Sequence, residues 1–214
     1  PTQRSHMMVV TGSSGDGKTA LMATFAKQLT TMDPHLFVLS HFCGAGQNSN
    51  DLHTMLTRLC WEIKAAFNLT ETSVPTDVKE LQRTFGELLK EAAFKGRLIV
   101  LLDAVDELIN DSATRAHALE WLPLELPCKF IISTTTTLAV EEKVAANSGF
   151  QYRTSLSAAV DNTTNNQVLD TIRNRKIANM VEVRMSPLSV EDRTHFIRDT
   201  LLEYHKRLDE RPMN

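Results

Sequence analysis

Short apolar runs alternate with longer amphipathic stretches along most of the sequence. The runs contain few polar positions, and each is predicted to be a strand: residues 7–11, 36–40, 98–102, 130–133 and 180–184. The run 98–102 is apolar throughout, which is typical of a strand buried on both faces in a parallel sheet.

The stretches between the runs carry apolar residues three and four positions apart, which predicts amphipathic helices. We predict helices over residues 51–67, 77–94, 113–121 and 167–176, one following residue 19, and one that Ser189 and Asp192 cap and that ends near residue 208. Residues 138–147 also favour a helix, and the polar stretch 148–166 is predicted to be a surface excursion. Strands alternating with helices predict an α/β fold, a doubly wound parallel sheet with helices on both faces. Ligands of such sheets bind at the carboxyl ends of the strands.

Residues 12–19, between the first strand and the first helix, fit the phosphate-loop pattern G-x-x-x-x-G-K-[ST]. A helix N-terminus offers unpaired N–H groups and a favourable dipole to an anion, so the correct flanks argue against an ordinary glycine-rich turn. We predict that Lys18 reaches the β- and γ-phosphates and that the Thr19 hydroxyl holds Mg²⁺. The predicted nucleotide contacts in this loop are Gly12, Ser13, Ser14, Gly15, Asp16, Gly17, Lys18, Thr19 and Ala20.

Asp103 directly follows the apolar run 98–102, so a parallel sheet would aim its carboxylate at the phosphate edge. Mg²⁺ takes oxygen ligands and keeps several waters, so Asp103, Thr19 and the phosphates suffice to hold it. Asp106 and Glu107 could polarise the water that attacks the γ-phosphate, or could simply be acidic residues that open a helix. Glu107 is preferred as the base because it reaches further. The candidate catalytic residues are Lys18, Asp103, Asp106 and Glu107.

The composition of the chain argues against several classes of function. The sequence is 42% hydrophobic and 23% charged with a net charge of −3, which gives no general electrostatic footprint for nucleic acid or an anionic membrane. Its three cysteines are too few and too far apart for a disulfide framework, so we expect reduced thiols in a cytoplasmic protein. We find no apolar run near the roughly 20 residues that a membrane-spanning helix needs, and we expect neither a membrane partner nor a nucleic-acid partner. Trp61 and Trp121 are both predicted to lie in the core.

The loop GSSGDGKT and the segment LLDAVDEL together resemble the NACHT family of signal-transduction ATPases. The stretches SHFCGAGQNSNDLHTMLTRLCWEI, LPCKFIIST and VEVRMSPLSVEDR are most similar to its nephrocystin and telomerase-associated-protein group. The resemblance implies a P-loop core of the ASCE type, in which strand 130–133 lies between the P-loop strand and the strand before Asp103. It also implies that Ser133 and Thr134 sense the γ-phosphate. Many members of the family carry arginine near there, whereas this chain continues Thr-Thr-Thr.

By the same resemblance, Pro187 marks the start of a helical subdomain. We therefore expect an NTPase core over residues 1–184, with an insertion at 138–166, and the start of a helical subdomain at 185–214. The expected partners are nucleotide, other domains of the same longer chain, and further copies in nucleotide-dependent self-association.

The leading functional hypothesis is a regulatory switch that binds ATP or ADP with Mg²⁺ and hydrolyses ATP slowly. ATP is favoured over GTP because no N-K-x-D-like segment follows the core. Two alternatives remain open: a scaffold that holds nucleotide with negligible turnover and, less favoured, a small-molecule kinase.

Overall fold

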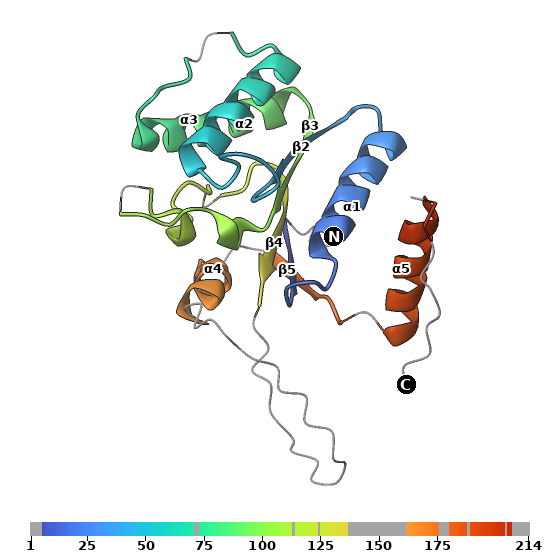
Figure 1. Cartoon of the computed structure of the whole chain (residues 1–214). Coiled ribbons are helices and arrows are strands. Elements are labelled where there is room, and N and C mark those ends of the chain that lie inside the picture. Colours follow the sequence, from blue (N-terminus) through green and yellow to red (C-terminus); the bar gives the residue numbers. More distant parts are fainter. Residues whose placement is uncertain are drawn as a thin grey trace, which may run out of the picture.

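The strands of the chain form one parallel sheet (Figure 1). The computed structural model describes residues 6–70, 73–112, 114–123, 125–136, 162–175, 180–187, 189–203 and 205–206. Within them the sheet has five strands in the order β2-β3-β4-β1-β5. Their bounds are β1 Met7–Gly12, β2 Leu36–Phe42, β3 Arg97–Asp103, β4 Lys129–Thr135 and β5 Met180–Arg184. β4 pairs with both β1 and β3, as predicted. The chain therefore has the α/β fold of a P-loop NTPase.

Helices lie on both sides of this sheet (Figure 1). One side carries α1 (Lys18–Met32) and α5 (Val190–Glu203). The other side carries α2 (Leu52–Phe67), α3 (Val78–Lys95) and α4 (Asn162–Asn174). The doubly wound arrangement predicted from the alternating runs is confirmed.

The sheet separates two hydrophobic clusters. Val100 and Leu102 of β3 point into the larger cluster with α2, α3 and α4, whereas Ile99 and Leu101 point into the smaller one with α1. Because successive side chains of a strand face opposite sides, a strand covered on both faces must be apolar at every position. This confirms the prediction made from the run 98–102.

Local capping explains where α2 and α3 begin. The Asp51 carboxylate accepts the N–H of Thr54 at 2.7 Å, and the Asp77 carboxylate accepts the N–H groups of Lys79 and Glu80 at 3.0 Å each. Caps of this kind typically stabilise a helix by about 1 kcal/mol. Both helices therefore start one residue after the aspartate that opened the predicted range.

Some predicted elements differ in the structure. The helix predicted over 113–121 is a single 3₁₀ turn, Ala116–Ala118, because Arg115 (φ 43°) and Leu119 (φ 55°) take left-handed conformations that an α-helix cannot include. α4 begins at Asn162, so the predicted excursion 148–166 overlaps a helix at its end. α5 ends at Glu203 and not near residue 208. The helix predicted over 138–147 lies outside the described residues.

The two tryptophans occupy different environments. Trp121 is buried and its Nε1–H donates to the carbonyl of Ala116 at 2.9 Å, as expected for a core residue. The prediction for Trp61 is wrong: 56% of this side chain is exposed on the outer face of α2, with Nζ of Lys64 5.1 Å from the ring centroid. Its position falls between the inward-facing residues of α2, so the helical period turns it away from the sheet.

The three cysteines, Cys43, Cys60 and Cys128, are buried free thiols, as expected. Burial raises the pKa of each thiol to about 12, so all three are neutral near pH 7. Within the described residues, no helix combines the length and apolar character that crossing a bilayer requires.

Candidate functional site

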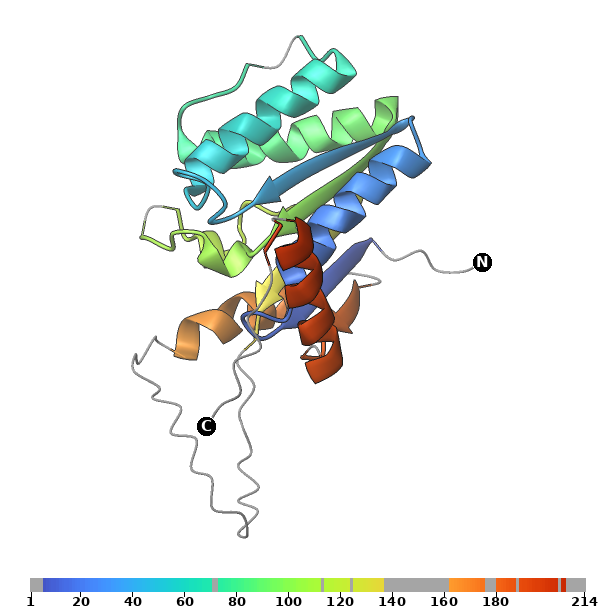
Figure 2. The ribbon, with the colours of Figure 1, turned by 45° about the vertical axis from the view of Figure 1, so that its right-hand side comes forward.

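The predicted site residues gather where the parallel strands end. Gly12 at the end of β1 pairs in register with Thr135 of β4, and Phe42 of β2 pairs with Asp103 of β3. Figure 2 shows these carboxyl ends on one side of the molecule, where β1 turns into α1. The P-loop and Asp103 therefore share one rim, as the parallel fold predicts.

Hydrogen bonds between its own residues hold the phosphate loop in shape. Gly15 (φ 87°) and Gly17 (φ 86°) adopt left-handed conformations that other residues rarely take, and Gly17 caps α1. Lys18 Nζ donates to the carbonyls of Gly12 at 2.9 Å and Ser13 at 2.8 Å. The Asp16 carboxylate accepts the N–H of Ser13 at 2.6 Å. Polar groups that a phosphate would contact are thus already partnered within the loop.

The remaining loop residues face outward. Ser14, Gly15, Thr19 and Ala20 are exposed, whereas the side chains of Asp16 and Lys18 are buried. Thr19 lies in the first turn of α1, directly after Lys18. The N-terminus of α1 is therefore open to an incoming anion and its metal.

Asp103 is buried with one oxygen satisfied and one without a partner. Its Oδ1 accepts the hydroxyl of Ser133 at 2.5 Å, and that hydroxyl oxygen accepts the N–H of Ala104 at 2.8 Å. Among the described residues, no group hydrogen-bonds to Oδ2, although this atom is buried. A buried carboxylate oxygen without a partner is costly, and an oxygen ligand of this type is what Mg²⁺ takes. Asp103 therefore fits the predicted metal site.

The two residues predicted to sense the γ-phosphate lie on different sides of β4. Ser133 contacts Asp103, while Thr134 falls on the strand face that carries Phe130 and Ile132 of the larger cluster. Thr134 Oγ1 is buried and has no hydrogen-bond partner within the described part of the chain. The structure therefore brings Ser133, and not the Thr134 side chain, to the carboxylate of Asp103.

The two candidate bases diverge from a 3₁₀ turn, Val105–Glu107. The Asp106 carboxylate accepts the N–H of Thr135 at 3.1 Å, which fixes it against the end of β4. Glu107 is exposed at the rim, and its carboxylate lies beside Gly44. Desolvation, followed by the negative charges of Asp106 and Asp103, raises the pKa of the Glu107 carboxyl, and Lys18 lowers it. Glu107 therefore stays the predicted base: among the described residues its carboxylate makes no hydrogen bond to β4, whereas Asp106 is bonded to Thr135.

A cavity of about 210 Å³ adjoins the P-loop on the side of β5. The backbone N–H of Met185 donates to the carbonyl of Thr11 at 2.7 Å, and that of Thr136 donates to the carbonyl of Gly12 at 3.0 Å. These bonds place residues from two distant segments against the loop. The lining is Gly12, Ser13, Asp16, Thr136, Arg184, Met185, Ser186 and Pro187. Of the residues beyond the loop, the sequence had singled out Thr136, as one of the threonines after Thr134, and Pro187, as a domain junction.

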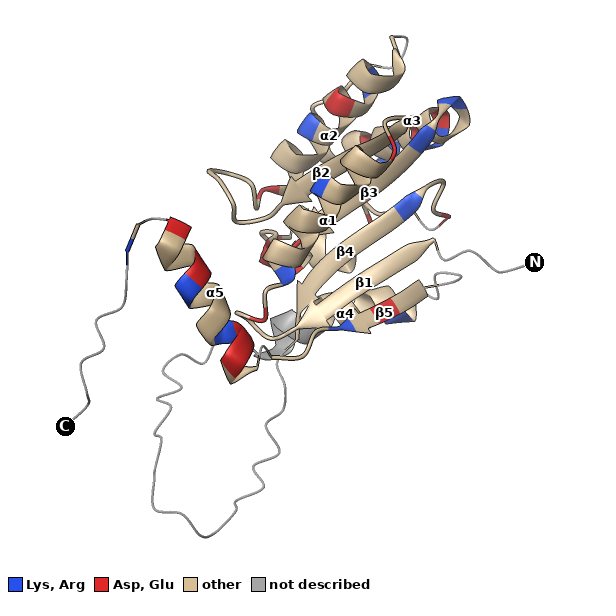
Figure 3. Ribbon diagram, turned by 90° about the vertical axis from the view of Figure 1, so that its right-hand side faces the viewer, with Lys and Arg blue, Asp and Glu red and all other residues tan. Residues whose placement is uncertain are grey.

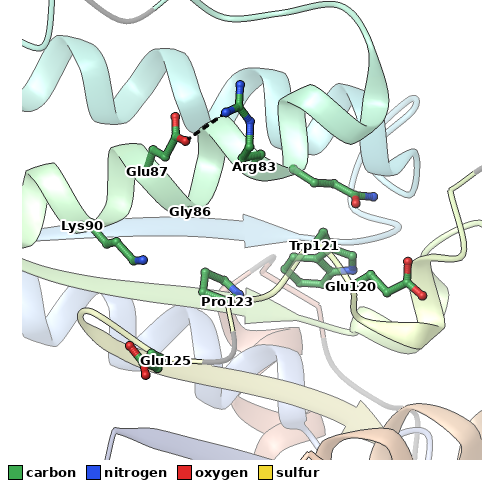
Figure 4. A pocket seen from close by; sticks show the side chains of 9 residues that line it. Arg83, Gly86, Glu87, Lys90, Glu120, Trp121, Pro123 and Glu125 are labelled. Atoms are coloured by element: carbon green, nitrogen blue, oxygen red, sulfur yellow. Dashed lines mark ion pairs between the residues drawn. The ribbon is translucent and has the colours of Figure 1, made fainter.

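A larger hollow, of about 460 Å³, lies away from the P-loop (Figure 4). It is formed between α3, which contributes the Arg83–Glu87 ion pair and Lys90, and the segment that carries Trp121 and Pro123. No residue predicted to bind phosphate or metal borders it. Its size alone does not make it the candidate site.

Comparison with known proteins identifies relatives of the chain. The family model described as Nephrocystin 3, N-terminal, matches residues 1–134. NACHT and WD repeat domain-containing protein 2 of Mus musculus is 32% identical over 145 residues, which are 63% of this chain and 8% of that protein. Telomerase protein component 1 of Rattus norvegicus is 25% identical over 220 residues, 97% of this chain and 7% of that protein.

Solved structures include one of AMPPCP-bound DnaA from Aquifex aeolicus, with 16% sequence identity and a TM-score of 0.44. The match covers 95% of this chain and 47% of the DnaA chain.

The chain spans less than a tenth of the length of the two curated relatives named above. Because the family model matches well over half of the sequence and includes the P-loop and Asp103, the chain belongs to the Nephrocystin 3, N-terminal family, which confirms the predicted NACHT- and nephrocystin-like relationship.

Proposed function

We propose that this chain is an ATP-binding, slowly hydrolysing regulatory module, a NACHT-type switch within a longer multidomain signalling protein. The observation that carries the proposal is the buried Oδ2 of Asp103, which lacks a hydrogen-bond partner and lies on the same rim as Lys18 and the N-terminus of α1. A strand-loop-helix phosphate cradle and a carboxylate oriented for a metal are the two parts that a P-loop NTPase requires.

Phosphate binding would exchange hydrogen bonds within the loop. Lys18 Nζ would leave the carbonyls of Gly12 and Ser13 for the β- and γ-phosphates, and the N–H of Ser13 would become available as Asp16 moves away. Thr19 and Asp103 would hold Mg²⁺, which supplies charge neutralisation for the phosphates when it is bound. The backbone N–H groups of the loop would orient the phosphate chain.

Hydrolysis would use Glu107. Its carboxylate, with a raised pKa, would accept the proton of the attacking water, while Asp106 stays bonded to Thr135 and shapes the turn. Ser133 links Asp103 to β4, so a γ-phosphate that contacts this group would be distinguished from ADP. Such differential contact is what a nucleotide switch requires.

The nucleoside would lie on the open side of the P-loop. The cavity beside β5, lined by Arg184, Met185 and Pro187, supports this placement because it adjoins the loop. We propose ATP as the nucleotide because no guanine-recognition segment follows the core. As few groups enclose this side, we expect the chain by itself to bind ATP more weakly than nanomolar and to turn it over slowly.

The setting of the module is also proposed from its relatives. The chain matches 8% of a mouse protein named for NACHT and WD repeat domains, which supports further domains in the same polypeptide as partners. We propose the core at residues 1–184 and the start of a helical subdomain at 185–214, in a cytoplasmic protein that self-associates when ATP is bound.

A binding measurement tests the phosphate site. Replacing Lys18 by alanine removes a charge-assisted contact worth about 1.5–3 kcal/mol. The Kd for a fluorescent ATP analogue should therefore rise roughly 10- to 150-fold. Lys27→Ala, an exposed position on the same helix, is the matched control and should leave the Kd unchanged. Equal affinity of wild type and Lys18→Ala would refute nucleotide binding at this loop.

A scaffold that holds nucleotide without turnover is the second candidate. The end of β4 favours it, because the family resemblance implies an arginine near this loop and the chain has Thr135 and Thr136 there. Hydrolysis by wild-type protein that is no faster than that of Glu107→Gln, with binding intact, would favour the scaffold over the switch.

A further inference from the structure

Gly44, in the loop between β2 and α2, lies against the candidate base. It has φ +74°, and a Cβ built on it would overlap Oε2 of Glu107 and lie 3.3 Å from Cδ. The Glu107 carboxylate therefore occupies the space that a side chain at position 44 would fill. Since the overlapping atom ends a flexible side chain, a larger residue would displace the carboxylate and leave the backbone in place.

Two backbone hydrogen bonds fix this loop to the segment that carries Glu107. The N–H of Cys43 donates to the carbonyl of Asp103 at 3.1 Å, directly before Gly44. At the far end of the loop, the N–H of Ile109 donates to the carbonyl of Asn50 at 2.8 Å. Glu107 lies between these two attachments in sequence, so its turn and the loop have a defined relative position.

The loop is also held from within. His41 Nε2 bonds to the carbonyl of Ser49 at 2.6 Å, and the hydroxyl of Ser49 donates to the carbonyl of Gly46 at 2.8 Å. Arg58 of α2 contacts Nδ1 of His41 at 2.9 Å and donates to the carbonyl of Ser40 at 2.8 Å. The position of Gly44 therefore does not depend on contact with Glu107.

We propose that Gly44 is a positioning residue for ATP hydrolysis. Because position 44 has no side chain, the Glu107 carboxylate has room to lie at the rim beside the strand that ends in Asp103. The inference rests on the proposed function, in which Glu107 accepts the proton of water. Gly44 is not among the residues proposed to hold nucleotide or metal, so its replacement should change the rate of hydrolysis and leave nucleotide affinity unchanged.

Three variants of the full chain separate the contact from backbone strain. Gly44→Ala and Gly44→Asn both add a Cβ, but asparagine tolerates a positive φ better than alanine. A contact effect should be at least as large in Gly44→Asn as in Gly44→Ala, whereas a strain effect should be weaker in Gly44→Asn. Gly46→Ala is the matched control, because Gly46 lies in the same loop, has no positive φ and has nothing within 4 Å of a built Cβ.

The expected result is a split between binding and turnover. Both Gly44 variants should bind the fluorescent ATP analogue within about twofold of wild type, and single-turnover hydrolysis should fall about 10²-fold, as for a misplaced catalytic group. In a Glu107→Asp background, whose shorter side chain does not reach position 44, Gly44→Ala should add little further loss. Gly46→Ala should match wild type in both measurements.

A second measurement does not depend on turnover. The ¹³C carboxyl resonance of Glu107, assigned by its loss in Glu107→Gln, should shift in both Gly44 variants and stay unchanged in Gly46→Ala. Unchanged resonance and hydrolysis in Gly44→Ala would overturn the proposal. Wild-type protein that binds ATP but hydrolyses it no faster than Glu107→Gln would instead refute hydrolysis, while the carboxyl resonance would still decide whether Gly44 positions Glu107.

Discussion

The phosphate-binding rim and helix α5 differ in how their side chains are held. At the rim, Asp16, Lys18 and Asp103 are buried and each has hydrogen bonds within the site. In α5, none of the described side chains is buried; 73% of Val190 and 63% of Phe196 are exposed. Figure 3 shows α5 standing apart from the sheet and α1, with charges of both signs along it.

This difference shows where the structure of the site is determined. A helix gains most of its stability by packing an apolar face. Within the part of the chain that the structure describes, α2 and α3 do so and α5 does not. The phosphate cradle therefore depends on the sheet and its packed helices, and contacts on α5 contribute little to it. Several variants test this comparison.

The largest effect is expected at the rim. Glu107→Gln keeps the shape of the side chain but removes the proposed base, so hydrolysis should fall by roughly 10²–10⁴-fold with nucleotide affinity nearly unchanged. Phosphate release measured under single-turnover conditions checks this. Glu125→Gln, an exposed acid away from the P-loop, is the control. A comparable loss of hydrolysis in Glu125→Gln would contradict the proposal that Glu107 is the base.

A pair of apolar truncations compares the two regions by stability. Leu102 is fully buried in the larger cluster, so Leu102→Ala should lower the free energy of unfolding by about 2–5 kcal/mol. Phe196→Ala on α5 should change it by no more than about 0.5 kcal/mol, because its ring is mostly exposed. Urea titrations of both variants measure the difference. A loss at Phe196 as large as that at Leu102 would show that α5 packs in solution.

Two helix caps provide a finer version of the same comparison. Asp77→Ala removes the bonds to Lys79 and Glu80 at the start of α3 and should cost about 1 kcal/mol of global stability. Ser189→Ala removes the bond to the N–H of Asp192 in α5 and should lower helix content without moving the urea midpoint. Circular dichroism combined with denaturation distinguishes the two outcomes.

The smallest effect is a pH dependence at His41. Burial, and to a lesser extent the charge of Arg58, lowers its pKa below the ordinary 6.5, although the Ser49 carbonyl and Glu62 oppose the shift. Just below pH 6.5 the unfolded chain then binds more protons than the folded chain. The stabilisation that comes from neutral His41 is therefore present above pH 6.5 and is lost as the pH falls through the lowered pKa of the folded chain. His41→Gln should lose less stability between pH 7.5 and about 5 than wild type. His195→Gln, at an exposed position, should behave like wild type.

Local patterns in the sequence predicted the strands, the main helices and the parts of the site that lie in one continuous segment. The P-loop and Asp103 could be recognised because each follows its own strand, and a parallel sheet brings strand ends together. The neighbours Thr136 and Met185 could not, because their contact with the loop depends on which strands flank β1.

Other differences between prediction and structure depend on side-chain positions that the pattern of hydrophobic and polar residues does not specify. Ser133 and Thr134 are equivalent in the sequence, but alternation along β4 places only Ser133 at Asp103. The contact of Gly44 with Glu107 joins two loops that are distant in sequence, and only the pairing of β2 with β3 brings them together. Among these residues, glycine at position 44 offered a signal, since a positive φ often requires it.

The internal bonds of the phosphate loop have a consequence for the proposed switch. Asp16 already supplies an anion to the Ser13 N–H, and Lys18 is already bound by two carbonyls, so the loop has its shape before any nucleotide arrives. In the proposed function, binding would exchange these side-chain hydrogen bonds for bonds to phosphate, while the backbone of the loop would keep its shape. If the proposed switch holds, its response to ATP would therefore begin where ATP and ADP differ, at the proposed contacts of Ser133 and Glu107 with the terminal phosphate and its water.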